Sequence, residues 1–293
     1  MKYVSKGRRA FLLINNTALI LLTLICFAPI LNTLAMSLSE SADVAAGRVT
    51  FWPVNFSLDA YQFILTRSEF FSSFLITLER LALGTALQMV LTVMCAYPLS
   101  KENRQFSLRT VYVWIFVFTM LFGGGVVPAY LNLKNAGLLG SIWALVLPGA
   151  VSVYNILLLL NAFRGLPREL EESFCIDGAG HIRTMLQLYV PLSKPTLATL
   201  LLFTMVAHWN SWFDGMLYMN KPENYPLATY LRSIIVSFDF TKVTSEDAYL
   251  LAKISTRTSK CAQIIVAMLP IMLVYPFLQK HFVKGIVLGS VKG

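Results

Sequence analysis

Apolar residues are gathered into six long runs, which are separated by shorter polar segments. The runs cover Phe11–Met36, Phe74–Leu99, Val111–Leu131, Gly140–Phe163, Pro195–Met216 and Cys261–Leu278. A helix needs about 20 mainly apolar residues to cross the hydrocarbon core of a bilayer, and each run is close to or above that length. Pro128, Pro148 and Pro270 lie inside or at the ends of runs, where packed membrane helices tolerate them. The pattern predicts an all-α membrane protein that crosses the bilayer about six times.

Composition and charge agree with a membrane protein. Of the 293 residues, 56% are hydrophobic and 13% are charged, and this is about half the charged fraction of a soluble domain. The first run is longer than the apolar region of a secretory signal peptide, so we expect a spanning helix there. If the basic N-terminal tail lies inside, the inner segments hold most of the 24 lysines and arginines. This distribution predicts that both termini are cytoplasmic.

The sequence contains no catalytic or metal-binding motif that we recognise. Its four cysteines are scattered and form no CxxC pair, and HExxH is absent. The phosphate-binding pattern GxxxxGK followed by Ser or Thr is also absent, so we expect no nucleotide site of that kind. We attribute the net charge of +9 to membrane topology and not to nucleic acid binding.

The segment between the fourth and fifth runs is dense in residues that start and stop helices. Pro167 can occupy the first turn of a helix, and three glutamates follow it closely. Asp177–Gly180 ends that helix, because glycine adopts the left-handed conformation. A second amphipathic stretch, Ile182–Val190, then leads to Pro191. The pattern predicts two short helices that project from the membrane, with an ordinary linker as the alternative.

This segment resembles the EAA loop of permease subunits of ATP-binding-cassette (ABC) importers. The motif of that family is Glu-Ala-Ala, three residues, Gly, nine residues and Ile-x-Leu-Pro. Here Glu172-Ser173-Phe174 stands at the Glu-Ala-Ala position, Gly178 has the required spacing, and Leu188-Tyr189-Val190-Pro191 matches the end. Asp177-Gly178-Ala179 matches the usual Asp-Gly-Ala run. Phe174 is the largest departure, because it replaces an alanine.

Four further stretches carry the resemblance over most of the chain. Ala96–Ser100 and Trp209–Phe213 are similar to the ends of the family's second and fifth spans. The tail from Gln279 to Gly293 resembles maltose-type, second-subunit sugar permeases. Phe122–Pro128 is similar to the polysaccharide-type branch, which includes rhamnogalacturonan and alginate permeases.

The resemblance implies the type I ABC importer permease fold in a bacterial inner membrane. Residues 1–70 would then form an N-terminal span and an outer segment, 71–282 the permease core with a coupling loop at 164–194, and 283–293 a cytoplasmic tail. The implied partners are a second homologous permease, two cytoplasmic ATPase subunits and an extracytoplasmic solute-binding protein. ATP and Mg²⁺ would be bound by the ATPase subunits, leaving this chain without a cofactor. The substrate would be an oligosaccharide or polysaccharide.

Two groups of candidate residues follow. The resemblance implies that the ATPase is contacted by Glu172, Ser173, Phe174, Asp177, Gly178, Ala179 and Pro191. Polar residues inside spans are costly and usually face a wet interior, and on this ground the pathway candidates are His208, Asn210, Trp212, Asp214, Gln88, Tyr154 and Asn155.

At helical spacing, His208 and Trp212 would share one face of the fifth span, and Asn210 and Asp214 another. Aromatic rings can stack on sugars, and amide and carboxyl groups can bind hydroxyls. An interfacial aromatic belt is the alternative for this cluster. Arg80, with its neighbour Glu79, is expected near the outer water interface.

Three other functions compete with a sugar importer permease. An ABC permease for a non-sugar solute would share the coupling loop. A secondary transporter or channel would not need that loop. A membrane enzyme would need an intramembrane catalytic set, and the sequence contains none that we recognise.

Overall fold

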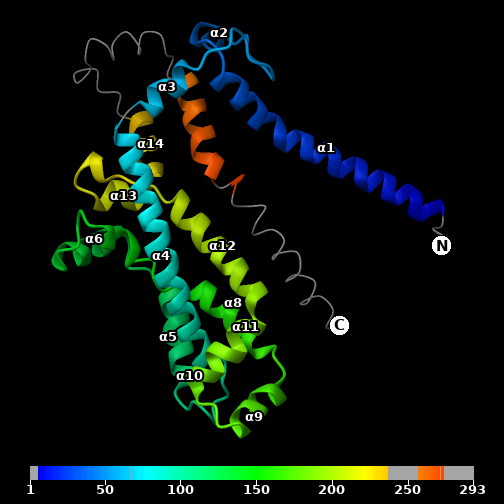
Figure 1. Cartoon of the computed structure of the whole chain (residues 1–293), viewed down its shortest axis with the longest axis vertical. Helices are drawn as coiled ribbons and strands as arrows, with labels where there is room; N and C mark the ends of the chain where they lie inside the picture. Colours follow the sequence, from blue (N-terminus) through cyan, green and yellow to red (C-terminus); the bar gives the residue numbers. More distant parts are fainter. Residues whose placement is uncertain (1–5, 67, 237–256, 271, 274–293) are drawn as a thin grey trace. The chain divides into compact units, whose positions relative to one another are not determined.

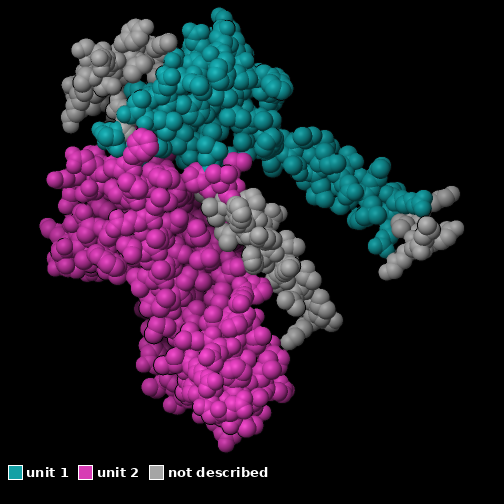
Figure 2. Space-filling view, viewed as in Figure 1, with its two compact units in different colours: residues 1–70, 233–269 teal, residues 71–232, 270–293 magenta. Residues whose placement is uncertain are grey.

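The chain is built from helices. The computed structural model describes residues 6–66, 68–236, 257–270 and 272–273, and within these the only β contact is an isolated bridge between Ser39 and Phe56. The structure divides into two compact units (Figure 2): residues 1–70 with 233–269, and residues 71–232 with 270–293. Each unit is described below by itself.

The first unit is dominated by one long apolar helix. Its labelled elements are α1 (Lys6–Ser37), α2 (Ser41–Ala45) and α3 (Asp59–Leu65), and residues 257–269 are also helical. Most apolar side chains of α1 are exposed, as expected of a helix that faces lipid. The segment after α1 folds back on it, because the Asn32 side chain donates to the Thr50 carbonyl at 2.6 Å. The buried Asp43 carboxylate accepts hydrogen bonds from Arg48 and Asn55 at 3.0 and 2.7 Å.

The second unit carries the remaining helices (Figure 1). They are α4 (Ser68–Ser100), α5 (Arg109–Leu121), α6 (Val126–Asn135), α7 (Ile142–Val146), α8 (Val153–Arg164), α9 (Arg168–Ile176), α10 (His181–Thr184), the π-helical segment Met185–Tyr189, α11 (Val190–Leu192), α12 (Lys194–Asn210), α13 (Phe213–Tyr218), a short 3-10 turn at Pro222–Asn224, and α14 (Leu227–Val236).

The first two predicted spans are confirmed as continuous helices, within α1 and α4. The third is wrong as a single helix, because α5 and α6 meet at 112°. The glycines before α6 cause this break, and Gly125 has a positive φ of 85° that only glycine adopts easily. Among the described helices, Gly7–Ser37 and Ser68–Ser100 are long and apolar enough to cross a membrane alone.

The fourth and fifth predicted spans are also interrupted. Residues 147–152 separate α7 from α8, and Pro148 lies in this gap, where it disfavours helix at the residue before it. The fifth span ends at Asn210, and Ser211 is extended with a ψ of 118° before α13 begins. The sixth begins in a helix at 257–270, but residues 274–278 lie outside the described part. If each bent helix pair is one span, up to four described spans pass the length test.

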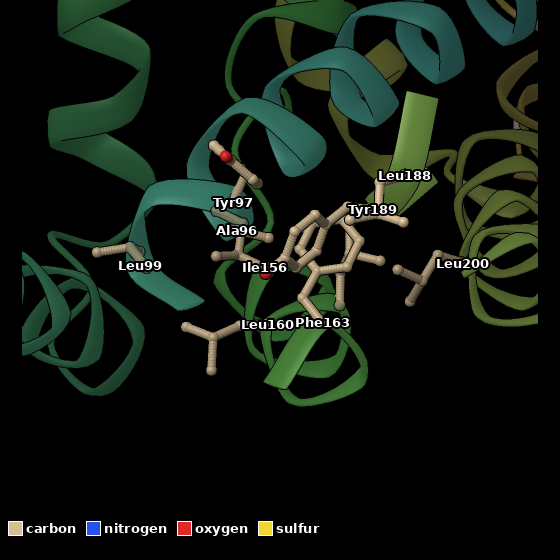
Figure 3. Close-up of a cluster of buried hydrophobic side chains, with 10 residues drawn as sticks. Ala96, Tyr97, Leu99, Ile156, Leu160, Phe163, Leu188, Tyr189 and Leu200 are labelled. Carbon is tan, nitrogen blue, oxygen red and sulfur yellow. The ribbon is translucent and has the colours of Figure 1, made fainter. Parts of the chain in front are cut away.

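The main buried core of the second unit lies where α4 ends (Figure 3). It joins α4, α8, the π-helical segment and α12 through Ala96, Tyr97, Leu99, Ile156, Leu159, Leu160, Phe163, Leu188, Tyr189 and Leu200. Tyr189 packs edge-on against Tyr97 and Phe163, with ring centroids 5.1 and 5.2 Å apart. Residues of the predicted coupling loop form part of this core and pack against it.

Candidate functional site

The start of the coupling loop follows the sequence prediction. Pro167 caps α9 with an extended ψ of 133°, and Glu169 and Glu171 lie in the first turn. Carboxylates at this end are favourable because they complement the positive end of the helix dipole. The resulting helix, Arg168–Ile176, has no buried residue. The first of the two predicted short helices is confirmed.

The end of α9 is closed by a Schellman turn. The Ala179 amide donates to the Phe174 carbonyl at 2.9 Å, and the Gly178 amide donates to the Cys175 carbonyl at 3.0 Å. Gly178 has a φ of +74°, although a β-carbon at this position would meet no atom within 4 Å. The position therefore requires glycine for its backbone conformation and not for space.

The second half of the loop is less regular than predicted. The stretch Ile182–Val190 is divided between α10, a π-helical segment at Met185–Tyr189, and the beginning of α11. Short π-helical turns are rare and are often found at functional sites. Ser193 then separates α11 from α12, and the helices on either side meet at 83°.

The predicted coupling residues lie on different sides of the loop. Glu172, Ser173, Asp177 and Pro191 are exposed and available to a partner, whereas Ala179 is half-buried in the turn. Phe174 packs inward against the buried core at the end of α4. Its large side chain, the main departure from the EAA pattern, thus fills space within the chain itself.

A charged junction fixes α9 to the end of α4. The Lys101 ammonium forms an ion pair with the Glu171 carboxylate and donates to the Tyr189 hydroxyl at 3.1 Å. Tyr189 in turn donates to Glu171 at 2.7 Å. The ammonium also lies 4.2 and 4.3 Å from the ring centroids of Tyr97 and Tyr189, within the range of cation–π attraction. This junction was not predicted, although Lys101 lies only two residues after the end of an apolar run.

The electrostatics of the junction favour the ionised carboxylate. Burial alone would raise the pKa of Glu171, but hydrogen bonds from Lys101 and Tyr189 and the positive charge of Lys101 outweigh it, and the pKa is lowered. The Lys101 side chain is only 7% exposed, so water screens this pair weakly. The junction therefore joins the coupling loop to a predicted span through a salt bridge that is present at neutral pH.

A second group of polar residues lies inside the helical body. Helix α4 buries a polar row consisting of Ser73, Thr77, Arg80, Thr85, Gln88 and Thr92. The spacing of three to five residues places them along one face of the helix. Facing this row are His208, whose ring packs against Gly84, and Asp214. We call this group the polar seam.

Arg80 is the charged centre of the polar seam. Its guanidinium forms an ion pair with Asp214 and donates to the Ser211 carbonyl at 3.2 Å. The residue is 3% exposed, so its guanidinium is enclosed by protein, and its expected depth near the outer water interface stays a prediction. The signal was present in the sequence, because a charge within an apolar run is costly and usually functional. Glu79 is exposed, as expected.

The helix break after Asn210 changes the predicted arrangement of the fifth span. His208 is buried on α12, but Trp212 lies beyond the break, so the two do not share a helical face. Asn210 is exposed, and Asp214 instead stands in the first turn of α13, where it accepts hydrogen bonds from Ser211 and the Gly215 amide. The predicted pairing of faces is wrong because α12 does not continue.

The other pathway candidates are dispersed. Gln88 is buried in the polar seam, and the buried Asn155 side chain donates to Thr204 at 3.1 Å. Tyr154 is 55% exposed. The ring of Trp212 lies 4.8 Å from the Arg232 guanidinium. Among the described residues, no three His, Cys, Asp or Glu side chains are placed to hold a metal ion.

Known proteins share this architecture. The family model for inner membrane components of binding-protein-dependent transport systems matches residues 88–288. Protein LplC of Bacillus subtilis (strain 168) is 40% identical over 269 residues, which are 92% of this chain and 90% of that protein. The polygalacturonan/rhamnogalacturonan transport system permease protein YtcP of the same organism is 38% identical over 275 residues, covering 94% of this chain and 96% of its own.

A solved structure is similar over nearly the whole chain. It is a crystal structure of a bacterial ABC transporter involved in the import of the acidic polysaccharide alginate. One of its chains superposes with a TM-score of 0.85 at 32% sequence identity, covering 96% of this chain and 100% of that one.

Proposed function

This chain belongs to the family of inner membrane components of binding-protein-dependent transport systems, and on this premise we propose that it is half of the translocation pathway of an ATP-driven importer of acidic oligosaccharides or polysaccharides. It is a membrane permease subunit and not an enzyme. In the proposal, a second homologous permease completes the pathway, two cytoplasmic ATPase subunits bind ATP and Mg²⁺, and an extracytoplasmic binding protein delivers the sugar.

The coupling loop is the observation that carries the proposal. Its tip leaves Ile176 86% and Ile182 72% exposed, next to the exposed carboxylates of Glu172 and Asp177. Large apolar side chains exposed on a charged loop are typical of a protein–protein contact. The Lys101–Glu171 junction behind the tip would pass a displacement of the loop to α4. The loop is thus suited to receive a movement from an ATPase subunit.

We infer six crossings with both termini inside. Helices α1, α4 and α12 would each cross once, and the bent pair α5–α6 would supply one more. Helix α8 with α7, and the helix that begins at residue 257, would supply the remaining two. The positions of the basic residues support this orientation, because Arg109, Arg164 and Lys194 all lie at helix ends that would face the cytoplasm.

The polar seam is the proposed lining of the pathway. Buried polar groups inside a membrane are costly unless they are paired or face water. Arg80, Asp214 and His208 lie together beside the helix break, and Gln88 extends the same row on α4. A break in a membrane helix frees backbone groups, which is tolerated where they line a cavity. Alternating access would open this seam to each side in turn.

The decisive experiment is co-purification followed by a coupling assay. Extracted in mild detergent, the chain should carry an ATPase dimer and a second permease, and a stable homo-oligomer without ATPase would contradict the proposal. Gly178→Val should then abolish uptake without reducing the amount in the membrane, because a β-branched residue at φ +74° costs at least about 1–2 kcal/mol and distorts the turn.

Gly180 provides a matched control two residues away. Its φ of −74° and ψ of 167° suit valine, and a β-carbon there would meet no atom within 4 Å. Gly180→Val should therefore retain uptake. Normal uptake by Gly178→Val, or equal loss in both variants, would show that the turn geometry is not what couples the loop to transport.

A further inference from the structure

A large polar pocket lies between the α4–α5 connection and the base of the coupling loop. Its volume is about 910 Å³, within the range of small-molecule sites. Five basic side chains line it: Lys101, Arg104, Arg109, Arg164 and Arg168. Neither the coupling contact nor the polar seam explains this concentration of cations.

Ion pairs within the chain neutralise only two of these cations. Lys101 pairs with Glu171, and Arg168 pairs with Glu102 at 2.5 Å. Arg104 makes no ion pair or hydrogen bond with any residue that the structure describes. The other two arginines bind only neutral groups: Arg109 donates to the Leu99 carbonyl at 2.8 Å and to the Asn103 side chain, and Arg164 donates to the Leu99 carbonyl. The pocket therefore retains three cations without a carboxylate partner, against one lining carboxylate, Glu172, that forms no ion pair among the described residues.

The position of these arginines at the ends of helices indicates which kind of anion the pocket would bind. Arg109 is the first residue of α5, and Arg164 is the last residue of α8. Both guanidiniums therefore stand where apolar helices end, which is the depth of lipid headgroups. Beside Arg109, the side chains of Leu108, Val111 and Ile115 are each more than half exposed. A phospholipid has a phosphate that would suit the arginines and acyl chains that would suit the apolar face of α5.

We propose that this pocket binds the phosphate of an anionic phospholipid headgroup through Arg104, Arg109 and Arg164. One guanidinium group can donate two parallel hydrogen bonds to the oxygens of a phosphate. Basic pockets between membrane helices bind anionic lipid headgroups. The acyl chains would lie along the exposed face of α5. The site adjoins Glu171, so an occupied pocket would stiffen the base of the coupling loop. Lipid binding itself does not depend on the proposed transport activity; only the assignment to the inner leaflet does.

The test is native mass spectrometry of the full-length chain in detergent, titrated with phosphatidylglycerol or phosphatidylcholine. The wild type should retain phosphatidylglycerol more tightly than phosphatidylcholine. Arg104→Gln should weaken phosphatidylglycerol binding about fivefold, and the triple variant with Arg109→Gln and Arg164→Gln roughly a hundredfold. Because Arg104 makes no ion pair or hydrogen bond among the described residues, the single variant is expected to fold and still tests the proposal if the triple variant misfolds.

Arg183→Gln is the control, because Arg183 is exposed, contacts Gln187 and does not line the pocket. It should bind phosphatidylglycerol as the wild type does. Unchanged phosphatidylglycerol binding in Arg104→Gln and the triple variant would overturn the proposal. Arginine-dependent binding of inorganic phosphate without lipid binding would overturn it in favour of a soluble anion. Loss of co-purifying ATPase with unchanged lipid binding would assign the surface to a protein contact.

Discussion

The ion pair between Arg80 and Asp214 leads to a prediction for a single residue. Asp214 follows the break between α12 and α13 and forms an ion pair with Arg80 of α4. Its side chain is 23% exposed, and that of Arg80 is 3% exposed. Removing one charge leaves the other unpaired in a poorly hydrated place. We expect Asp214→Asn to lower the free energy of unfolding by about 3 kcal/mol, the lower end for broken buried pairs, measured by denaturant unfolding of the purified protein in detergent.

The control for this effect is the double variant. Arg80→Gln with Asp214→Asn removes both charges, so it should recover part of the stability that either single variant loses. Glu79→Gln, at the exposed neighbouring position, should leave stability nearly unchanged. Additive losses in the double variant would mean that the two groups do not stabilise each other.

Individual residues differed in how far the sequence could predict them. Gly178 was predictable, because a glycine just past the end of a helical pattern indicates a left-handed cap. The partner of Arg80 was not, because 134 positions separate it from Asp214 and no periodicity connects them. Phe174 was identified as a departure, but its inward packing depends on the shape of a core formed by four separate segments.

At the scale of elements, the junction between α4 and α9 predicts an acid dependence. The pKa of Glu171 is lower in the folded chain than the value of about 4.3 in an unfolded one. The unfolded chain therefore takes up a proton first as the pH falls. The junction should stabilise fully above about pH 4.3 and lose this contribution as the pH falls through the folded-state pKa. Thermal unfolding of the purified protein against pH measures it.

Glu171→Gln should reduce this acid-induced loss and should lower stability at neutral pH, where the salt bridge is intact. Glu169→Gln alters an exposed carboxylate on the same helix and should keep the wild-type pH profile. An identical acid response in Glu171→Gln and the wild type would show that the Lys101–Glu171 pair contributes nothing measurable to the stability of the fold.

The elements also show where hydrophobic pattern alone fails. Continuous runs predicted α1 and α4 well, because a single Gly84 in α4 and a single Pro29 in α1 do not interrupt these helices, and neither run contains a cluster of glycines. The third run includes three glycines and splits at 112°, and the fourth splits around Pro148 and Gly149. Hydropathy measures only the preference for lipid, and it does not distinguish one straight helix from two bent ones of equal composition. The glycine signal was identified as a family feature but not as a break.

For the whole molecule, the prediction concerns the substrate that activates the assembled importer. The proposed function implies a substrate with a carboxylate on many sugars, like the polysaccharides for which the relatives are named. We expect oligogalacturonate or oligoalginate to stimulate ATP hydrolysis of the reconstituted complex with its binding protein. A neutral maltooligosaccharide of equal length should have little effect. Because exposed charges attract over about 10 Å at 0.1 M salt, stimulation at low substrate concentration should weaken as ionic strength rises. Equal stimulation by the neutral sugar, without salt dependence, would contradict an acidic substrate while leaving the permease assignment intact.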